Sequence, residues 1–361
     1  MPTIDAADLT RYAERIFIGT GSPPDDANTV ATHLVEANLK GHDSHGAIRI
    51  ENYVRDVGSG AIQPGVVTEV ESESDTTAVL NGHWNYGQVV GRDTMAAAID
   101  KARAHGVGIV TAHRCAHAGR LGTYGEQAAR AGMFAIVCSN QHGVVGAVAP
   151  FGGAAHRLST NPIVVAVPSA DPEAPFVLDI ATTMSAEGKV RVARNRGEKL
   201  PLGWIIDAEG NPSTDPWDLY GGNPPGSRPR GSLLPMGGPV GHKGFGLSMA
   251  VELLGGALSP AGLARPGPKG GGNGLFMLAF DPGRFGDAAA IAEGVSGLIE
   301  RVKQPPFAPG VDEIFTAGEI ERRRMQERLR DGITIDDETW RQIVDAATTV
   351  GVDPADTPAV R

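Results

Sequence analysis

Residues 107–139 read VGIVTAHRCAHAGRLGTYGEQAARAGMFAIVCS, and this stretch indicates the class of fold. Two β-rich runs, VGIVTA and FAIVCS, flank a polar loop and a short helical pattern, GEQAARAG. Further runs of the same kind are TTAVLNG, PIVVAVP and FVLDIAT, and the helical pattern RDTMAAAIDKARAHG precedes the quoted stretch. The middle of the chain is therefore predicted to be a sheet with helices packed on it.

The two ends of the chain have a helical pattern instead. Apolar side chains recur at intervals of three and four residues in DAADLTRYAERIF and PDDANTVATHLVEANLK near the start, and helical patterns return in GEIERRRMQERLRDG and DDETWRQIVDAATTVG near the end. A chain of 361 residues favours two domains, or one large domain with an elaboration. The sequence predicts an α+β protein that begins and ends in a helical layer.

Composition excludes several classes of protein. The net charge is -10 and no block of basic residues is present, so nucleic acid is not an expected partner. Cys115 and Cys138 have no CxxC spacing, which fits a reducing compartment. The opening residues lack a signal-peptide pattern, and no apolar run approaches the roughly 18 residues that span a bilayer. We expect a cytoplasmic protein with no membrane segment.

Residues 41–50, GHDSHGAIRI, are a candidate site. On a continuous helix His45, Arg49 and Tyr53 would share one face. An arginine binds a carboxylate through two hydrogen bonds and a histidine titrates near neutrality, so the pattern suits a small acid that gains or loses a proton. The alternative is a solvated helix face capped by Ser44. A hydrolase built on Ser44 and His45 is not expected, because helical neighbours point about 100° apart and no GxSxG elbow is present.

A second candidate site follows the run VGIVTA, where His117 precedes several glycines that lead into a helix. Such a turn lets backbone amides approach a phosphate. The spacing is not GxGxxG, however, and no acid about 20 residues on takes the ribose, so a standard Rossmann site is not predicted. In PMGGPVGHKGFGL, Lys243 beside His242 offers a charge for a phosphate. A structural turn is the alternative for both segments.

Pairs of histidines at short spacing raise the question of a metal. His42 and His45 form HxxH, and His113 and His117 form HxxxH. No acids or cysteines near them in sequence complete a ligand set. No catalytic metal is predicted.

Six motifs, taken together and in order, resemble the second type of malate/L-lactate dehydrogenase family, which includes sulfolactate, ureidoglycolate and diketogulonate dehydrogenases and a cyclic imino acid reductase. The motifs are DSHGAIRI with Tyr53, AHAGRLGTYGEQAA, APFGG followed by STNP, LDIATT with EGKV, LPLGWIIDAEGNPSTDP, and GGPVGHKGFGLSMAVELL. The resemblance implies a non-Rossmann fold, with a largely antiparallel NAD(P) domain at 76–284 and a helical domain formed by residues 1–75 and 285–361. A homodimer is expected.

The resemblance also implies roles for individual residues. His45, with Ser44 beside it, resembles the proton donor and acceptor, and His117 is the other candidate for that role. Arg49 resembles the carboxylate clamp, with Tyr53 and Thr160 as further substrate contacts. The segments that match cofactor contacts are His117, Ala118, Gly119, Arg120 and Leu121, then Asp179, Ile180 and Ala181, then His242 and Lys243.

The function implied by the resemblance is transfer of a hydride between NAD or NADP and a small 2-hydroxy or 2-oxo carboxylic acid, such as malate, lactate or sulfolactate. We expect His45 to move the proton. An imino acid reductase of the same family is an alternative, although Lys189 stands where that enzyme has an aspartate of its proton relay. A metal-dependent hydrolase or lyase and a non-catalytic binding protein for small acids are alternatives from other classes.

Overall fold

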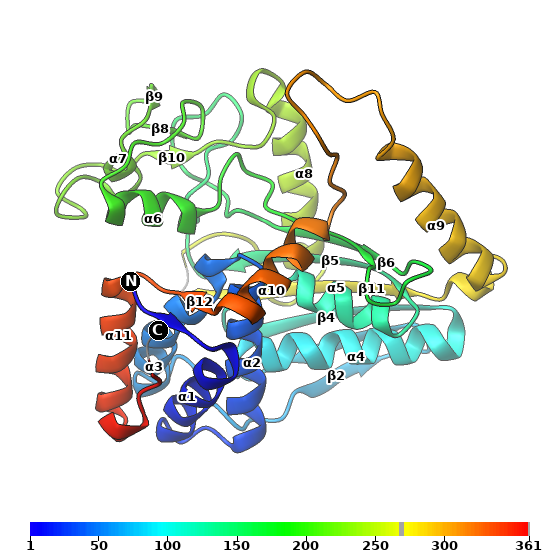
Figure 1. Cartoon of the computed structure of the whole chain (residues 1–361), viewed down its shortest axis with the longest axis horizontal. Coiled ribbons are helices and arrows are strands. Elements are labelled where there is room, and N and C mark those ends of the chain that lie inside the picture. Colours follow the sequence, from blue (N-terminus) through cyan, green and yellow to red (C-terminus); the bar gives the residue numbers. More distant parts are fainter. Residues whose placement is uncertain (267–270, 360–361) are drawn as a thin grey trace.

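A seven-stranded sheet forms the centre of the computed structural model, which describes residues 1–266 and 271–359 (Figure 1). In spatial order the strands are β2 (Glu69–Glu73), β3 (Thr77–Asn81), β4 (Val107–Cys115), β11 (Gly272–Phe280), β5 (Phe134–His142), β6 (Ile163–Val167) and β7 (Phe176–Ile180). Within the described residues β3 and β4 are the one parallel pair, and all other neighbours in this sheet are antiparallel. The predicted largely antiparallel sheet is confirmed.

Strand β11 separates β4 from β5, although β4 and β5 follow one another in the chain. Its alternating side chains bury Leu275 and Met277 against one face and Phe276 against the other. The first face is covered by α4 (Gly87–His105) and α5 (Gly122–Arg130). The second is covered by α8 (His242–Glu252) and the π-helical turn that continues it, Leu253–Ala257. The loop that carries His117 follows the last residue of β4, an inner strand of this sheet, which is covered on both faces.

The two ends of the chain meet in one hydrophobic cluster. Strand β1 (Thr3–Ile4) pairs with β12 (Ile333–Thr334). Most of the cluster comes from α1 (Ala6–Gly19), α2 (Pro24–Leu39), α3 (Ile50–Gly58) and α11 (Asp337–Thr349), and Val89 of α4 joins it. Helix α10 (Glu319–Asp331) packs on α2. By contrast, α9 (Ala288–Val302) has no buried residue and lies across the molecule from α1 and α11 (Figure 1). The domain boundaries expected at 75/76 and 284/285 stay predictions.

A smaller unit, not separated by the sequence patterns, lies between β7 and α8 in the chain. Its three-stranded sheet is β8 (Ile205–Ile206), β9 (Pro212–Ser213) and β10 (Ser232–Leu233), with helices α6 (Glu187–Arg196) and α7 (Pro216–Tyr220). These elements surround a separate apolar core that includes Val190, Leu219 and Leu233. The unit brings α6 against the segment 43–45, so residues of the middle of the chain border the first candidate site.

The predicted helices at both ends are confirmed, and side chains explain where two of them begin. Asp5 accepts hydrogen bonds from the Ala7 and Asp8 amides at the start of α1, and Asp336 caps α11 by accepting from the Thr339 amide. Short 3-10 turns occur at Gly238–Val240, Pro282–Arg284 and Pro354–Asp356. In the part of the chain that the structure describes, no helix has both the length and the apolar character needed to cross a membrane.

Candidate active site

The segment 41–50 is not one continuous helix, so that prediction is wrong. Asp43–His45 and Ala47–Arg49 form two 3-10 turns, and the backbone of Gly46 between them is extended, with φ -93° and ψ -150°. Asn38 fixes this break: its Oδ1 accepts the Ala47 amide at 2.7 Å, and its Nδ2 donates to Asp43 Oδ1 at 2.7 Å. A Cβ at position 46 would collide with the Asn38 side chain, so the break requires glycine.

Ser44 and His45 are in direct contact. The Ser44 hydroxyl and Nδ1 of His45 are hydrogen-bonded at 3.0 Å. The sequence predicted an α-helix on which the two side chains would not meet, which is wrong because the residues lie in a short 3-10 turn and are hydrogen-bonded. Nε2 is then the ring nitrogen that a ligand can meet.

His117, the other candidate for proton transfer, lies beside His45. The two rings stack with 5.6 Å between centroids and 22° between planes. Nδ1 of His117 is hydrogen-bonded to the Tyr53 hydroxyl at 2.7 Å. Tyr53 in turn accepts from Nε2 of Gln88 at 2.9 Å. Gln88, 1% exposed in the first turn of α4, was missed by the sequence reasoning, because one glutamine in a helical pattern carries no signal of its own.

Arg49 completes this group of side chains. Its Nε donates to the Ser44 carbonyl at 2.8 Å, which fixes the guanidinium next to the Ser44–His45 pair. Burial, and then the charge of Arg191, lower the pKa of Arg49 below its ordinary value, but an arginine keeps its proton at any working pH. A buried cation with unused donors favours an anion.

Burial and the Arg49 charge control the protonation of both histidines. Burial, followed by Arg49, lowers the pKa of His45 to about 3, and the same two causes lower the pKa of His117 well below its ordinary range. Burial raises the pKa of Tyr53 to about 12. Both imidazoles are therefore neutral and the phenol is protonated at neutral pH, while His45 and His117 are each partly exposed as residues.

The loop before α5 uses three of its amides inside the protein. The Ala118 amide donates to Asn273 Oδ1 at 2.9 Å, the Arg120 amide to His33 Nε2 at 2.9 Å, and the Gly122 amide to Asp179 Oδ2 at 2.8 Å. Gly119 has φ +70°, and a side chain there would meet His33. These three amides are not free for a phosphate, contrary to the reading of this loop as an anion site.

The charged side chains of this segment also have partners inside the protein. Arg120, 2% exposed, pairs with Glu126 at 2.9 Å and lies 3.9 Å from Asp179. Glu126 also pairs with the buried Lys40. Ion pairs therefore hold the loop in shape, and any contact of Arg120 with a cofactor would be made by its backbone.

The other predicted site residues have contacts of their own within the described structure. The Thr160 carbonyl accepts from the amide and hydroxyl of Thr182, and Ile180 and Ala181 stand at the end of β7. His242 is exposed at the start of α8 and meets the ring of Phe151 edge-on, with 5.8 Å between centroids. Among the described residues, neither Thr160 nor His242 hydrogen-bonds to the His45–His117 group.

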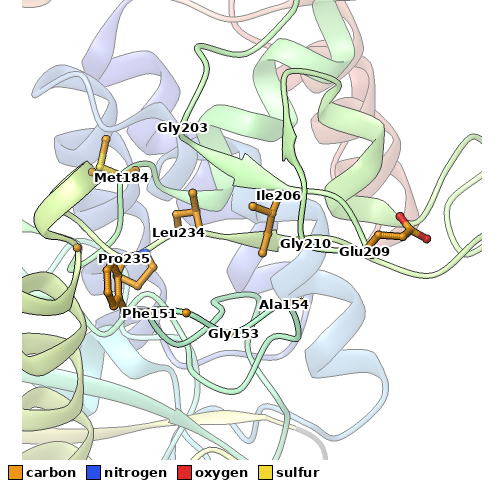
Figure 2. Close-up of a pocket in the computed structure, with 13 residues that line it drawn as sticks. Phe151, Gly153, Ala154, Met184, Gly203, Ile206, Glu209, Gly210, Leu234 and Pro235 are labelled. Carbon is orange, nitrogen blue, oxygen red and sulfur yellow. The ribbon is translucent and has the colours of Figure 1, made fainter.

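A pocket of about 400 Å³ lies close to this end of α8 (Figure 2). It is lined by the turn 151–154, by residues of the small sheet such as Ile206, and by Leu234, Pro235 and Gly241. Glu209 is its one ionisable lining residue. Neither histidine of the site lines it, so the pocket is not where the two imidazoles act.

The histidines at metal-like spacing have other partners. His42 lies 3.5 Å from Glu321, and His113 bonds Glu71 at 2.8 Å. In residues 1–266 and 271–359 no group of three or more His, Cys, Asp or Glu side chains is arranged to hold a metal ion.

Comparison with known proteins identifies relatives over nearly the whole chain. The malate/L-lactate dehydrogenase family matches residues 4–344. The chain is 36% identical to an L-lactate dehydrogenase of Cupriavidus necator over 352 residues, covering 97% of this chain and 98% of the relative. It is 35% identical to a malate dehydrogenase of Pyrococcus horikoshii over 353 residues, covering 96% and 94%.

Solved structures agree with this assignment. The crystal structure of malate dehydrogenase from Entamoeba histolytica superposes with a TM-score of 0.91 at 27% identity, covering 97% of this chain and 98% of that one. The delta1-piperideine-2-carboxylate reductase of Pseudomonas syringae superposes with a TM-score of 0.80 at 26% identity, covering 96% and 100%.

Proposed function

Because the chain belongs to the malate/L-lactate dehydrogenase family, we propose that it transfers a hydride between a nicotinamide cofactor and a small 2-hydroxy or 2-oxo carboxylic acid. Members of this family are oxidoreductases. One observation carries the proposal: two stacked imidazoles, His45 and His117, lie beside the buried cation of Arg49. This reaction requires a side chain that exchanges a proton and a side chain that binds the carboxylate.

Arg49 binds the carboxylate of the acid. Its Nε is already fixed on the Ser44 carbonyl, so the remaining guanidinium donors point in a set direction. A charge-assisted bond to a carboxylate gains strength in a buried site. Holding the carboxylate there aims C2 and its oxygen at the histidines.

His45 exchanges the proton of the C2 oxygen. In the free protein its pKa of about 3 leaves the ring neutral, which is the form that takes a proton from a hydroxyl group. A bound carboxylate offsets the Arg49 charge and so raises the pKa of His45, which favours the protonated ring that the reverse reaction needs. Ser44 holds Nδ1 and keeps Nε2 toward the acid.

His117 orients the substrate oxygen and is itself oriented by Tyr53. Gln88 donates a hydrogen bond to the Tyr53 oxygen, and the Tyr53 hydroxyl in turn donates to Nδ1 of His117. The neutral ring carries its own proton on Nε2, from which it donates to the oxygen at C2. Tyr53 acts here through His117 and not as the direct substrate contact expected from the sequence.

The first turn of α8 suits the phosphates of NAD or NADP. No side chain caps this helix, whose N-cap is Gly241, and the exposed Lys243 stands in its first turn next to His242. Free amides, the helix dipole and a lysine together favour an anion. Lys243 and His242 would hold the phosphates without a Rossmann unit, and the nicotinamide, when bound, supplies or accepts the hydride at C2.

The cyclic imino acid reductase is the second candidate, because one such enzyme shares the fold. Gly188 packs directly against Ser44, and the next residue, Lys189, is exposed. A cation at this position cannot extend the Ser44–His45 pair with an acid. The oxo acid is therefore the better substrate class for this chain.

We also propose a homodimer. Met249, Leu253 and Leu258 project from the outer face of α8 and its π-helical extension and are exposed. Helix α9 is apolar, yet none of its residues is buried. Covering such faces with a second copy removes apolar surface from water, and sedimentation of the purified protein measures the outcome. The cytoplasmic location expected from the sequence stays a prediction.

Binding of cofactor tests the proposal first. Mixing the protein with NADH or NADPH should enhance or shift nicotinamide fluorescence, and oxidation of the bound nucleotide should follow addition of a 2-oxo acid. A metal-dependent enzyme would instead lose activity with a chelator and regain it with zinc, and that result would end the proposal.

A further inference from the structure

Two nitrogen atoms of the Arg191 guanidinium are buried without a partner, although the residue as a whole is partly exposed. Its Nε and Nη2 atoms are shielded from solvent and make no hydrogen bond, and among the described residues it forms no ion pair. Arg120, the buried arginine described above, also has an Nε without a hydrogen bond, but its Nη2 pairs with Glu126. Leaving charged donors unpaired in the interior costs free energy, so such an arrangement indicates a missing anion.

The nearest acid on the same helix does not supply that anion. Glu187 stands one turn before Arg191, at the spacing of a helical ion pair. Its carboxylate instead accepts the Tyr220 hydroxyl at 2.6 Å. Arg191 is left without the partner that the sequence offers.

The fold places the helix that carries Arg191 next to the active site. Gly188 and Arg191 lie three residues apart on α6 and therefore share a face. A Cβ on Gly188 would overlap the Ser44 side chain, so this face of α6 lies directly against the Ser44–His45 turn. The charge of Arg191 also contributes to lowering the pKa of both Arg49 and His117. Two arginines thus act on one small region.

We propose that Arg191 binds a second anionic group of the substrate, so that the preferred acid is a dianion: a 2-oxo or 2-hydroxy acid with a carboxylate or sulfonate at its far end. The inference rests on the proposed function, in which Arg49 takes the carboxylate next to C2. One carboxylate is satisfied by one guanidinium fork. A monoanion would leave the second buried cation unpaired, whereas a dianion matches both charges.

A pair of acids of equal chain length tests the assignment. Oxaloacetate and 2-oxobutyrate differ in one group, a carboxylate against a methyl. The ratio of their kcat/KM values is measured with reduced cofactor for the wild type, for Arg191→Gln and for Arg196→Gln, an exposed arginine on the same helix. We expect Arg191→Gln to lower the ratio roughly a hundredfold, as loss of a buried charge partner does, and Arg196→Gln to leave it unchanged.

Three results would overturn the assignment. If Arg191→Gln lowers kcat/KM equally for both acids, Arg191 has no part in selectivity. If the variant raises only the KM for the nucleotide, Arg191 binds the cofactor. A wild type that prefers 2-oxobutyrate would refute a dianionic substrate. If the wild type turns over no 2-oxo acid with either nucleotide, the proposed function itself fails. If Arg191→Gln does not fold, malonate, an unreactive dianion, decides the matter: it should raise the melting temperature of the wild type more than acetate does, and an equal effect would refute the proposal.

Discussion

The imidazole of His45 stacks on that of His117 at 5.6 Å, and each ring is held at Nδ1 by a hydroxyl group, Ser44 for the first and Tyr53 for the second. One ring comes from the helical layer and the other from the loop after β4. Both Nε2 atoms are left for a ligand. Arg49, fixed on the Ser44 carbonyl, makes the region attractive to an acid.

Replacing the two histidines should separate their roles. We expect His45→Ala to reduce kcat by about two to four orders of magnitude, as loss of a general acid or base does, with cofactor affinity nearly unchanged. His117→Ala should mainly raise KM for the acid. Steady-state kinetics with fluorescence titration of the nucleotide measures both. Normal turnover in His45→Ala beside an inactive His117→Ala that binds cofactor would reverse the assignment.

Tyr53→Phe should weaken catalysis through His117. The variant loses the hydroxyl that holds Nδ1, so we expect kcat to fall about tenfold, equivalent to ~1.4 kcal/mol in the barrier, and the pH profile to shift. Tyr86→Phe is the matched control, because Tyr86 is also buried and packs near Tyr53, but its hydroxyl bonds Ser22 at 2.9 Å instead of a histidine. If both variants lose only stability, Tyr53 has no positioning role.

Arg49→Lys should raise KM for the acid by about ten- to a hundredfold, since lysine keeps the charge but loses the two-pronged geometry and the bond to the Ser44 carbonyl. The melting temperature should change little by comparison. An unchanged KM in a folded variant means that the carboxylate binds elsewhere.

Buried histidines should make the fold sensitive to acid. Burial, followed by Arg120, lowers the pKa of His33 from an ordinary 6.5 to about 3, and its Nε2 accepts the Arg120 amide. As the pH falls, the unfolded chain protonates His33 before the folded protein does. The contribution of neutral His33 to the free energy of unfolding is therefore complete above pH 6.5 and is lost as the pH falls toward 3. Thermal unfolding across this range should show a falling melting temperature.

Two variants assign that pH dependence. In His33→Gln an amide oxygen can accept the hydrogen bond from the Arg120 amide without titrating, so the melting temperature should depend less steeply on pH. The dependence that is left comes from His45 and His117. His105→Gln, at the exposed end of α4, should leave the slope as in the wild type. Identical slopes in all three proteins would remove His33 from the account.

Periodic patterns and six motifs in the sequence predicted the largely antiparallel sheet and the family, and these two predictions are confirmed. It failed where tertiary contacts override local rules. Asn38 breaks the expected helix at Gly46, and His33, Asp179 and Asn273 occupy the amides that a glycine-rich loop seemed to offer.

Gln88 and Arg191 could not be found from the sequence for a different reason. Each is an ordinary residue of a helical pattern, and its significance comes from what surrounds it: a tyrosine hydroxyl for Gln88, and the lack of any partner for the buried atoms of Arg191. Only the folded structure contains that information.

The most direct test of the central claim is oxidation of NADH or NADPH by a series of 2-oxo acids, followed by the absorbance of the reduced nicotinamide, with a chelator present throughout. The account predicts turnover of at least one small 2-oxo acid, at a rate that the chelator does not change. Absence of nucleotide oxidation with every acid, or activity that returns only when zinc is added, would contradict it.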